Sequence, residues 1–255
     1  MKKSIQYLKK IINNPVDVAI ITGSGLSGIK DILNDSIDIY YSEIPDYFQT
    51  TVKGHDGQLI FGQYNNKNIL IASGRFHFYE GLSIEQVGLP IQIFNQLGCK
   101  KVIITNSSGC LVSDWDLGDI MIVNGHYDFT FRDSTDNPKL VNGSDYYSTQ
   151  LIDLALKVNS TLRLGTYGWV LGPAYETKSE INNMLNEGVN AVGMSTIPEV
   201  LMAHKLNVDI LVLALMSNYA VGLTSDQLTH ETVLINSKKH NQNFQLLLKA
   251  ILSKI

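Results

Sequence analysis

Short runs of β-branched and other apolar residues alternate along the chain with segments whose apolar residues recur every three or four positions. Runs of the first kind are typical of buried strands, and segments of the second kind are typical of helices that pack one face on a sheet. The strand runs are 16–22, 68–72, 101–105, 119–123, 167–171, 191–194 and 208–216. This alternation predicts an α/β fold with a central, largely parallel or mixed β-sheet flanked by helices.

Several of the predicted helices have recognisable starts. Thr177-x-x-Glu180 has the form of a capping box, in which each side chain bonds the backbone N–H of the other residue. Pro198 suits the first turn of another helix, where its missing N–H is tolerated. The last long helix is expected from about Thr229 to the end of the chain, which places His230 in its first turn.

Composition narrows the class of protein. The 255 residues are 44% hydrophobic, and no linker or repeat interrupts them, so we expect a single domain over 1–255. The 20 basic and 24 acidic residues give a net charge of −4, without a dense block of Lys or Arg. A broad nucleic-acid-binding surface is therefore not expected, and an anionic substrate would be held by a few local groups in a pocket.

The cysteines and the apolar stretches bear on location. Cys99 and Cys110 lie in neither a CxxC pair nor a disulfide-scaffold spacing, which indicates a reducing compartment and makes the cytoplasm the expected location. No stretch approaches the roughly 20 uninterrupted apolar residues of a membrane span, so no membrane association is expected. No cluster of His, Cys or carboxylate residues has metal-ligand spacing, so we predict no metal site.

A glycine-rich loop follows the first predicted strand. Residues 23–28, Gly-Ser-Gly-Leu-Ser-Gly, match GxGxxG, and such glycines let backbone N–H groups close on an anion. A dinucleotide site, as in an NAD-dependent oxidoreductase, would need a full crossover helix and an acidic strand end about 20 positions on, and residues 29–34 are too short for that helix. The pattern favours a phosphate cradle, with the Ser24 hydroxyl as an extra donor, over a dinucleotide site or a plain structural turn.

A second polar segment, residues 74–81 (Gly-Arg-Phe-His-Phe-Tyr-Glu-Gly), follows another apolar run. In extended geometry Arg75, His77 and Tyr79 would share one side of the chain. The Arg75 fork suits phosphate oxygens, and His77 can add a hydrogen bond. The alternative is a solvated charged turn with packed aromatic rings.

Two further strands, 101–105 and 208–216, also lead into polar residues, Asn106-Ser107-Ser108-Gly109 and Ser217-Asn218-Tyr219. Open α/β sheets bind ligands beyond the carboxyl ends of their strands. The convergence of these ends with the two segments above therefore predicts one binding site.

The motifs together resemble those of the trimeric purine nucleoside phosphorylases, a family that includes xanthosine and methylthioadenosine phosphorylases. The resemblance covers about 16–234 and is carried by ITGSGLSG, GHDGQLIFG, GRFHFYEG, VIITNSSG, GDIMIVNGHYDF, GPAYET, VGMSTIPEV, SNYAVGL and THETVL. It implies the nucleoside phosphorylase fold, a cytoplasmic homotrimer and a role in purine salvage.

The resemblance also implies roles for individual residues. Asn218, Glu176, His77 and His230 would be catalytic. The phosphate site would contain Ser24, His55, Arg75, His77, the backbone N–H of Ser107, and Ser195. The ribose site would contain Tyr79, Met194 and His230, and the purine site would contain Ser108, Tyr175, Glu176, Val192 and Asn218.

The implied reaction is the reversible phosphorolysis of 6-oxopurine nucleosides, namely inosine, guanosine and their deoxy forms. Its products are the free base and ribose or deoxyribose 1-phosphate. Inorganic phosphate is the co-substrate, and no cofactor is required. Asn218 carries both a donor and an acceptor, so it can bond N7 and the 6-oxo group, which favours these substrates over methylthioadenosine.

Several alternatives stay open at this point. Within the family, the chain could prefer xanthosine or methylthioadenosine. Outside it, the alternatives are a nucleoside hydrolase, a non-catalytic nucleoside-binding protein and the NAD-dependent oxidoreductase. The anion-binding groups Arg75, His77, Ser24 and Ser195 favour a phosphorylase over a nucleoside hydrolase or a non-catalytic nucleoside-binding protein.

The chain departs from the family pattern in three places, one of which is Tyr175, where phenylalanine is frequent. Ser107-Ser108 stands where many relatives have two alanines, which adds hydroxyls near the phosphate or base. Relatives also present an Arg-Phe-Pro segment whose aromatic ring reaches the neighbouring subunit's ribose site. The nearest equivalent here is Asp145-Tyr146-Tyr147, and Tyr146, Tyr147 or neither could take that place.

Overall fold

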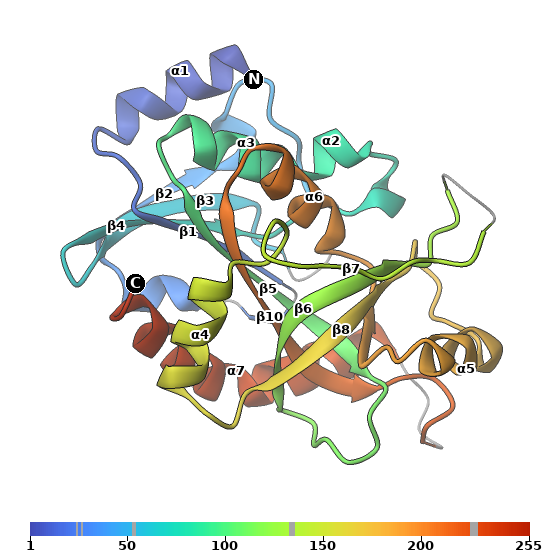
Figure 1. Ribbon diagram of the computed structural model, residues 1–255. Coiled ribbons are helices and arrows are strands. Elements are labelled where there is room, and N and C mark those ends of the chain that lie inside the picture. Colours follow the sequence, from blue (N-terminus) through green and yellow to red (C-terminus); the bar gives the residue numbers. More distant parts are fainter. Residues whose placement is uncertain (24, 27, 53–54, 133–135, 225–228) are drawn as a thin grey trace.

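The computed structural model of the protein describes residues 1–23, 25–26, 28–52, 55–132, 136–224 and 229–255 (Figure 1). Every predicted strand is present with shifted ends: β1 (Val18–Thr22), β4 (Lys67–Ser73), β5 (Lys101–Cys110), β6 (Ile120–Asp128), β8 (Arg163–Trp169), β9 (Ala191–Gly193) and β10 (Asp209–Tyr219). Three further strands are β2 (Asn34–Tyr40), β3 (Gln58–Tyr64) and β7 (Val141–Asn142).

These strands join in one mixed sheet in the order β10-β6-β8-β9-β5-β1-β4-β3-β2, with β7 paired to β6. Strand β5 also pairs with β10, so β5, β10, β6, β8 and β9 close into a ring. The predicted α/β class with a mixed sheet is confirmed. The single-domain interpretation of residues 1–255 stays a prediction.

Helices cover both faces of the sheet. They are α1 (Lys2–Ile11), α2 (Ile84–Val87), α3 (Leu89–Gln96), α4 (Thr149–Val158), α5 (Lys178–Asn186), α6 (Ile197–Lys205) and α7 (His230–Leu252), with 3₁₀ turns η1 (Ile29–Ile32), η2 (Tyr41–Glu43) and η3 (Phe78–Glu80). Helices α1, α2, α3 and α6 lie on one side of the central strands, and α4 and α7 lie on the other (Figure 1).

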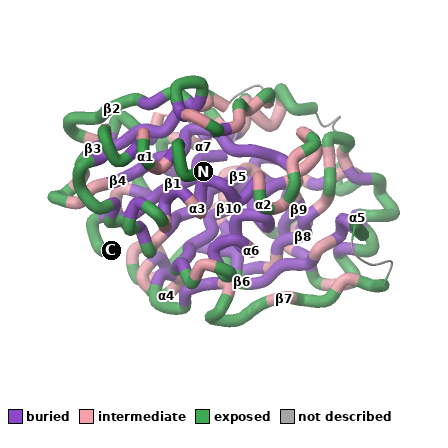
Figure 2. Tube along the Cα trace, turned by 90° about the horizontal axis from the view of Figure 1, so that it is seen from above, coloured by how far each residue is buried: buried purple, intermediate pink, exposed green. Residues whose placement is uncertain are grey.

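Alternating residues of the central strands supply the two apolar layers, because successive side chains of a strand point to opposite faces. In β1, Ala19 and Ile21 belong to the cluster that includes α3 and α6, whereas Val18 and Ile20 belong to the cluster that includes α4 and α7. Buried residues therefore follow the central strands, and exposed residues lie at the periphery (Figure 2).

The local helix signals are confirmed. The Thr177 hydroxyl accepts the backbone N–H of Glu180, and Glu180 Oε2 accepts the backbone N–H of Thr177 at 2.7 Å, which completes the capping box of α5. Pro198 lies in the first turn of α6, and Thr229 caps α7 so that His230 begins it. The turn after the glycine loop is only η1, as the short segment 29–34 indicated.

Strands β5 and β10 continue past their predicted ends, which corrects the placement of two motifs. Strand β5 continues to Cys110 and β10 to Tyr219, so Asn106 and Ser217 lie within strands and not after them. The two strands pair along this extension, with a register shift between Met216 and Asn218. Polar residues hold extended backbone here because the neighbouring strand satisfies their N–H and C=O groups.

The two tyrosines before α4, Tyr146 and Tyr147, both contact residues of their own chain. Tyr147 is 2% exposed, and its hydroxyl is 2.7 Å from Nδ1 of His126 on β6. The Tyr146 ring stacks on His204, with ring centroids 4.1 Å apart. In this arrangement Tyr147 packs inside its own chain.

The buried His126 should make stability depend on pH. Burial lowers the pKa of His126 from 6.5 to about 4, so the unfolded chain binds a proton before the folded protein does as pH falls. We therefore expect the free energy of unfolding to decrease from about pH 6.5 down to about pH 4, by at most about 1.4 kcal/mol per pH unit from this group. Urea denaturation between pH 7.5 and 4.5 should show a shallower decrease for His126→Gln; an unchanged slope would contradict this assignment.

Candidate active site

A cavity with about 680 Å³ of empty space opens where β5, β9 and β10 meet the loops after β1 and β4. It is lined by Gly23, Arg75, His77, Tyr79, Asn106, Ser107, Gly109, Tyr175, Glu176, Val192, Gly193, Met194, Ser195, Asn218, His230 and Val233. Most of the predicted site residues are therefore brought together.

Three predicted residues are not among those that line the cavity. Ser24 lies outside the described residues. The His55 ring lies behind the cavity wall, 5.4 Å between centroids from His77, and its Nδ1 accepts the backbone N–H of Arg75 at 3.2 Å. Ser108 is buried, and its hydroxyl donates to Asn106 Oδ1 at 2.6 Å instead of facing the cavity. The predicted purine contact of Ser108 has no support from this geometry.

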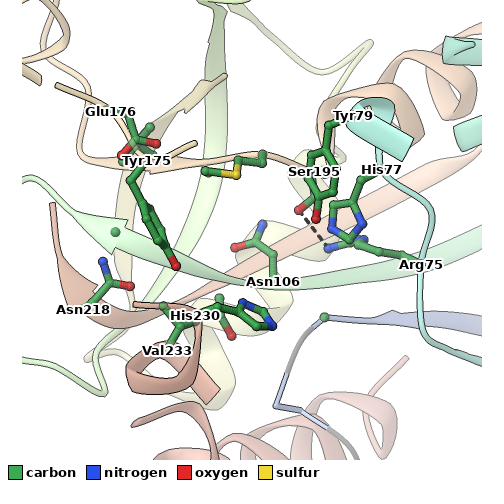
Figure 3. Close-up of a pocket in the computed structure, with 16 residues that line it drawn as sticks. Arg75, His77, Tyr79, Asn106, Tyr175, Glu176, Ser195, Asn218, His230 and Val233 are labelled. Atoms are coloured by element: carbon green, nitrogen blue, oxygen red, sulfur yellow. Dashed lines mark hydrogen bonds between the residues drawn. The ribbon is translucent and has the colours of Figure 1, made fainter. Parts of the chain in front are cut away.

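The Arg75 guanidinium forms the inner end of the cavity although it is only 1% exposed. Its Nε donates to Glu199 Oε1 at 3.0 Å. Its Nη1 donates to the carbonyl oxygen of Thr105 at 2.8 Å and to Ser195 Oγ at 3.2 Å (Figure 3). Nη2 is buried and has no hydrogen-bond partner among the residues that the structure describes. A buried N–H without a partner is costly, so Nη2 is a ready donor to an anion.

His77 and Tyr79 lie beside Arg75, but not through the extended geometry expected from the sequence. The chain turns into η3 after His77, and the rings of His77 and Tyr79 stack with centroids 4.8 Å apart. Both side chains still line the cavity, with their rings stacked on each other.

Glu80 sets the orientation of the His77 ring. Burial alone would raise the pKa of Glu80, but hydrogen bonds from His77 and Thr51 lower it to about 2, so the group is an ionised acceptor. Its Oε1 lies 3.3 Å from His77 Nδ1. Burial also lowers the pKa of His77. In the neutral ring Nδ1 therefore carries the hydrogen, and Nε2 is an acceptor.

Gly23 allows the glycine loop to lie against β5. A Cβ at this position would be 2.8 Å from the Cα of Asn106, closer than side-chain carbons approach backbone atoms. Gly23 and the Asn106–Ser107 backbone therefore lie against each other and both line the cavity. Substitution of Gly23 by any larger residue would separate them.

Tyr175, Glu176 and Asn218 lie at the end of the cavity away from Arg75 (Figure 3). Glu176 is 9% exposed, and burial raises its pKa. Asn218 Oδ1 accepts the Ser217 hydroxyl at 2.8 Å, and Nδ2 donates to the carbonyl oxygen of Tyr219 at 3.0 Å. The second N–H of the Asn218 amide is left for a ligand.

His230 and Val233 approach from α7, between the two ends (Figure 3). The Asn236 amide of the same helix donates to the carbonyl oxygen of Ser217 at 2.8 Å, which ties α7 to β10. The cavity thus has a cationic end, a carboxylate–amide end and a middle lined by rings and Met194. Within the described ranges no group of three His, Cys, Asp or Glu side chains is arranged to hold a metal ion.

Sequence reasoning missed some of the residues that shape this site. Gly193 and Val233 line the cavity without any chemical signal in the sequence. Glu80 could have been found, because it lies three residues after His77. The contact of Glu199 with Arg75 could not be predicted, since Thr196-Ile-Pro-Glu199 has the form of an ordinary capping box.

Comparison with known proteins supports the resemblance noted in the sequence. Residues 17–253 match the model of the phosphorylase superfamily. Purine nucleoside phosphorylase 1 of Geobacillus stearothermophilus is 34% identical over 262 residues, covering 98% of this chain and 96% of the relative. The chain belongs to the purine nucleoside phosphorylase family.

Solved structures from this family have the same fold. A schistosome purine nucleoside phosphorylase in complex with hypoxanthine superposes with a TM-score of 0.89 at 31% identity, covering 100% of this chain and 96% of that one. The Schistosoma mansoni enzyme in complex with inosine gives the same TM-score and identity and covers 95% of that chain. The nucleoside phosphorylase fold expected from the sequence is confirmed.

Proposed function

We propose that the protein catalyses the reversible phosphorolysis of 6-oxopurine nucleosides to the free base and ribose or deoxyribose 1-phosphate. The observation that carries this proposal is the buried Arg75 side chain, which lines one end of the cavity and whose Nη2 has no partner among the described residues. Glu176 and Asn218, at the other end, match the hydrogen-bonding edge of a purine. Membership of the family and the complexes of the schistosome relatives with hypoxanthine and inosine support it.

The Arg75 end would hold inorganic phosphate. Nη2 of Arg75, the Ser195 hydroxyl and the backbone N–H of Ser107 are donors suited to phosphate oxygens. His77 Nε2, as an acceptor, would receive a hydrogen bond from the single hydroxyl group of HPO₄²⁻. The predicted contributions of Ser24 and His55 stay predictions.

The other end would hold the base. Glu176 would accept the purine N1–H, and the remaining N–H of Asn218 would donate to N7 and the 6-oxo group. Tyr175 and Val192 would line the ring faces, while Tyr79, Met194 and His230 would contact the ribose. His230 would reach the 5′-hydroxyl.

The reaction needs no covalent enzyme intermediate. The bond from C1′ to N9 breaks with its electron pair going to the base, and a bond forms between C1′ and a phosphate oxygen. The hydroxyl proton of HPO₄²⁻ ends on the released base, so the charges balance. Phosphate lies under the cationic sugar and Asn218 meets the developing negative charge, so orientation and fixed donors would supply the acceleration.

Several finer points belong to the proposal. A xanthosine- or methylthioadenosine-preferring phosphorylase is the alternative within the family. A homotrimer in the cytoplasm that requires no cofactor is what the family likeness suggests. Among the residues that the structure covers, no helix has the length and apolar character to cross a membrane.

Nucleoside cleavage should require phosphate. We expect inosine to be converted to hypoxanthine and ribose 1-phosphate when phosphate is present, because phosphate is the nucleophile. Chromatography of inosine reactions with and without phosphate measures this directly. Undiminished release of free ribose in phosphate-free buffer would indicate a hydrolase instead.

Asn218→Asp should change the preference for the base. A carboxylate cannot donate a hydrogen bond to N7 and repels a 6-oxo group, but it can accept a hydrogen bond from a 6-amino group. We therefore expect kcat/KM for inosine to fall by about 10²-fold and kcat/KM for adenosine to fall less. Steady-state kinetics on both nucleosides gives the ratio. Asn95→Asp is the matched control, since Asn95 lies on α3 and its side chain bonds only Lys100 among the contacts described. Equal losses on both nucleosides in Asn218→Asp would contradict the assigned contact.

A further inference from the structure

A fully buried carboxylate lies directly behind Arg75. Glu199, in the first turn of α6, is 0% exposed, and its Oε1 is 3.0 Å from Arg75 Nε. Glu199 is not among the residues that line the cavity. It therefore acts on a ligand only through the guanidinium.

Helix capping does not account for the conformation of Glu199. In α5 the corresponding residue, Glu180, bonds back to the N-cap backbone of Thr177. In α6 the N-cap Thr196 has a φ of +78° and makes no side-chain cap bond, and its hydroxyl accepts from Asn106 Nδ2 at 2.8 Å. The carboxylate of Glu199 is thus withdrawn from the cap and paired with Arg75.

The pairing fixes the direction of the one guanidinium nitrogen that is left over. Glu199 accepts a hydrogen bond from Nε. The Thr105 carbonyl oxygen and Ser195 Oγ accept hydrogen bonds from Nη1. Because the guanidinium is planar, fixing Nε and Nη1 also fixes Nη2. Nη2 is buried without a partner in the described part of the chain, as expected of a donor held ready for a ligand.

The carboxylate also makes the buried cation tolerable. An isolated guanidinium at 1% exposure would carry a large desolvation penalty, which an adjacent carboxylate offsets. The Arg75–Glu199 pair has no net charge, so an anion at Nη2 would be held by a directed donor and not by an excess of positive charge.

We propose that Glu199 is a positioning residue for phosphate, whose carboxylate holds Arg75 through Nε so that Nη2 faces a phosphate oxygen. This inference rests on the proposed function. The competing interpretation is that Glu199 only fastens α6 to the loop after β4 and contributes to stability alone.

Two variants separate these interpretations. Glu199→Asp keeps the charge but draws the carboxylate back by one methylene group, and Glu199→Gln keeps the length but removes the charge. Glu180→Asp is the matched control, because it shortens a carboxylate at the equivalent position in the first turn of α5. The readouts are KM for phosphate, KM for inosine and the rise in Tm caused by phosphate without nucleoside.

We expect Glu199→Asp and Glu199→Gln to raise KM for phosphate by about tenfold or more, because a misdirected guanidinium loses a charge-assisted hydrogen bond. KM for inosine should change by less than about twofold, and the rise in Tm with phosphate should shrink in parallel with the weaker binding. Glu180→Asp should keep the wild-type KM for phosphate. A folded Glu199→Asp protein with a lower Tm and an unchanged KM for phosphate would overturn the proposal.

Glu199→Gln leaves a buried cation unpaired and is the variant more prone to misfold, whereas Glu199→Asp keeps the pair neutral. Should neither fold, NMR of the wild-type arginine side chains decides. The Arg75 Nε–H resonance should hold its position when phosphate is added, and a large displacement would overturn the proposal.

Absence of phosphate-dependent cleavage in the wild type would contradict the proposed function, whereas normal wild-type activity with an unaffected Glu199→Asp variant would contradict only the positioning role.

Discussion

The buried ion pair between Arg75 and Glu199 is the interaction on which the rest of the site depends. A charged guanidinium at 1% exposure is stable only because a carboxylate, a backbone carbonyl and a hydroxyl surround it. These partners come from α6, β5 and the β9–α6 connection, so the pair also joins elements far apart in the sequence. The one nitrogen that none of them uses, Nη2, is buried and has no partner among the described residues.

The sheet explains why such a pair can form. Strands β1, β4 and β5 run parallel, so the glycine loop, the Arg75 segment and the Asn106–Ser107 backbone emerge at the same edge. Strand β5 also closes a ring with β9 and β10, which brings Val192 and Asn218 round to the far side of the cavity. Backbone pairing thus sets the cationic end and the carboxylate–amide end of the cavity relative to each other.

Much of this could be predicted from the sequence, because apolar runs and motif residues are local signals. The central strands, the cap of α5 and cavity residues such as Arg75 and Glu176 follow from them or from family likeness. The edge strand β2 could not, since its first five residues are all exposed and only Ile39 of the strand is buried. Glu199 was missed for a related reason: its partner is 124 residues away, and a local pattern offers a helix cap instead.

The central claim is that Arg75 presents Nη2 to phosphate while the opposite end of the cavity binds the purine. The most direct measurement is a crystal structure of the protein soaked with phosphate and hypoxanthine. We predict a phosphate oxygen within hydrogen-bonding distance of Arg75 Nη2, with Nε still on Glu199, and the base between Glu176 and Asn218. Phosphate bound elsewhere, or Arg75 turned away from it, would contradict the account.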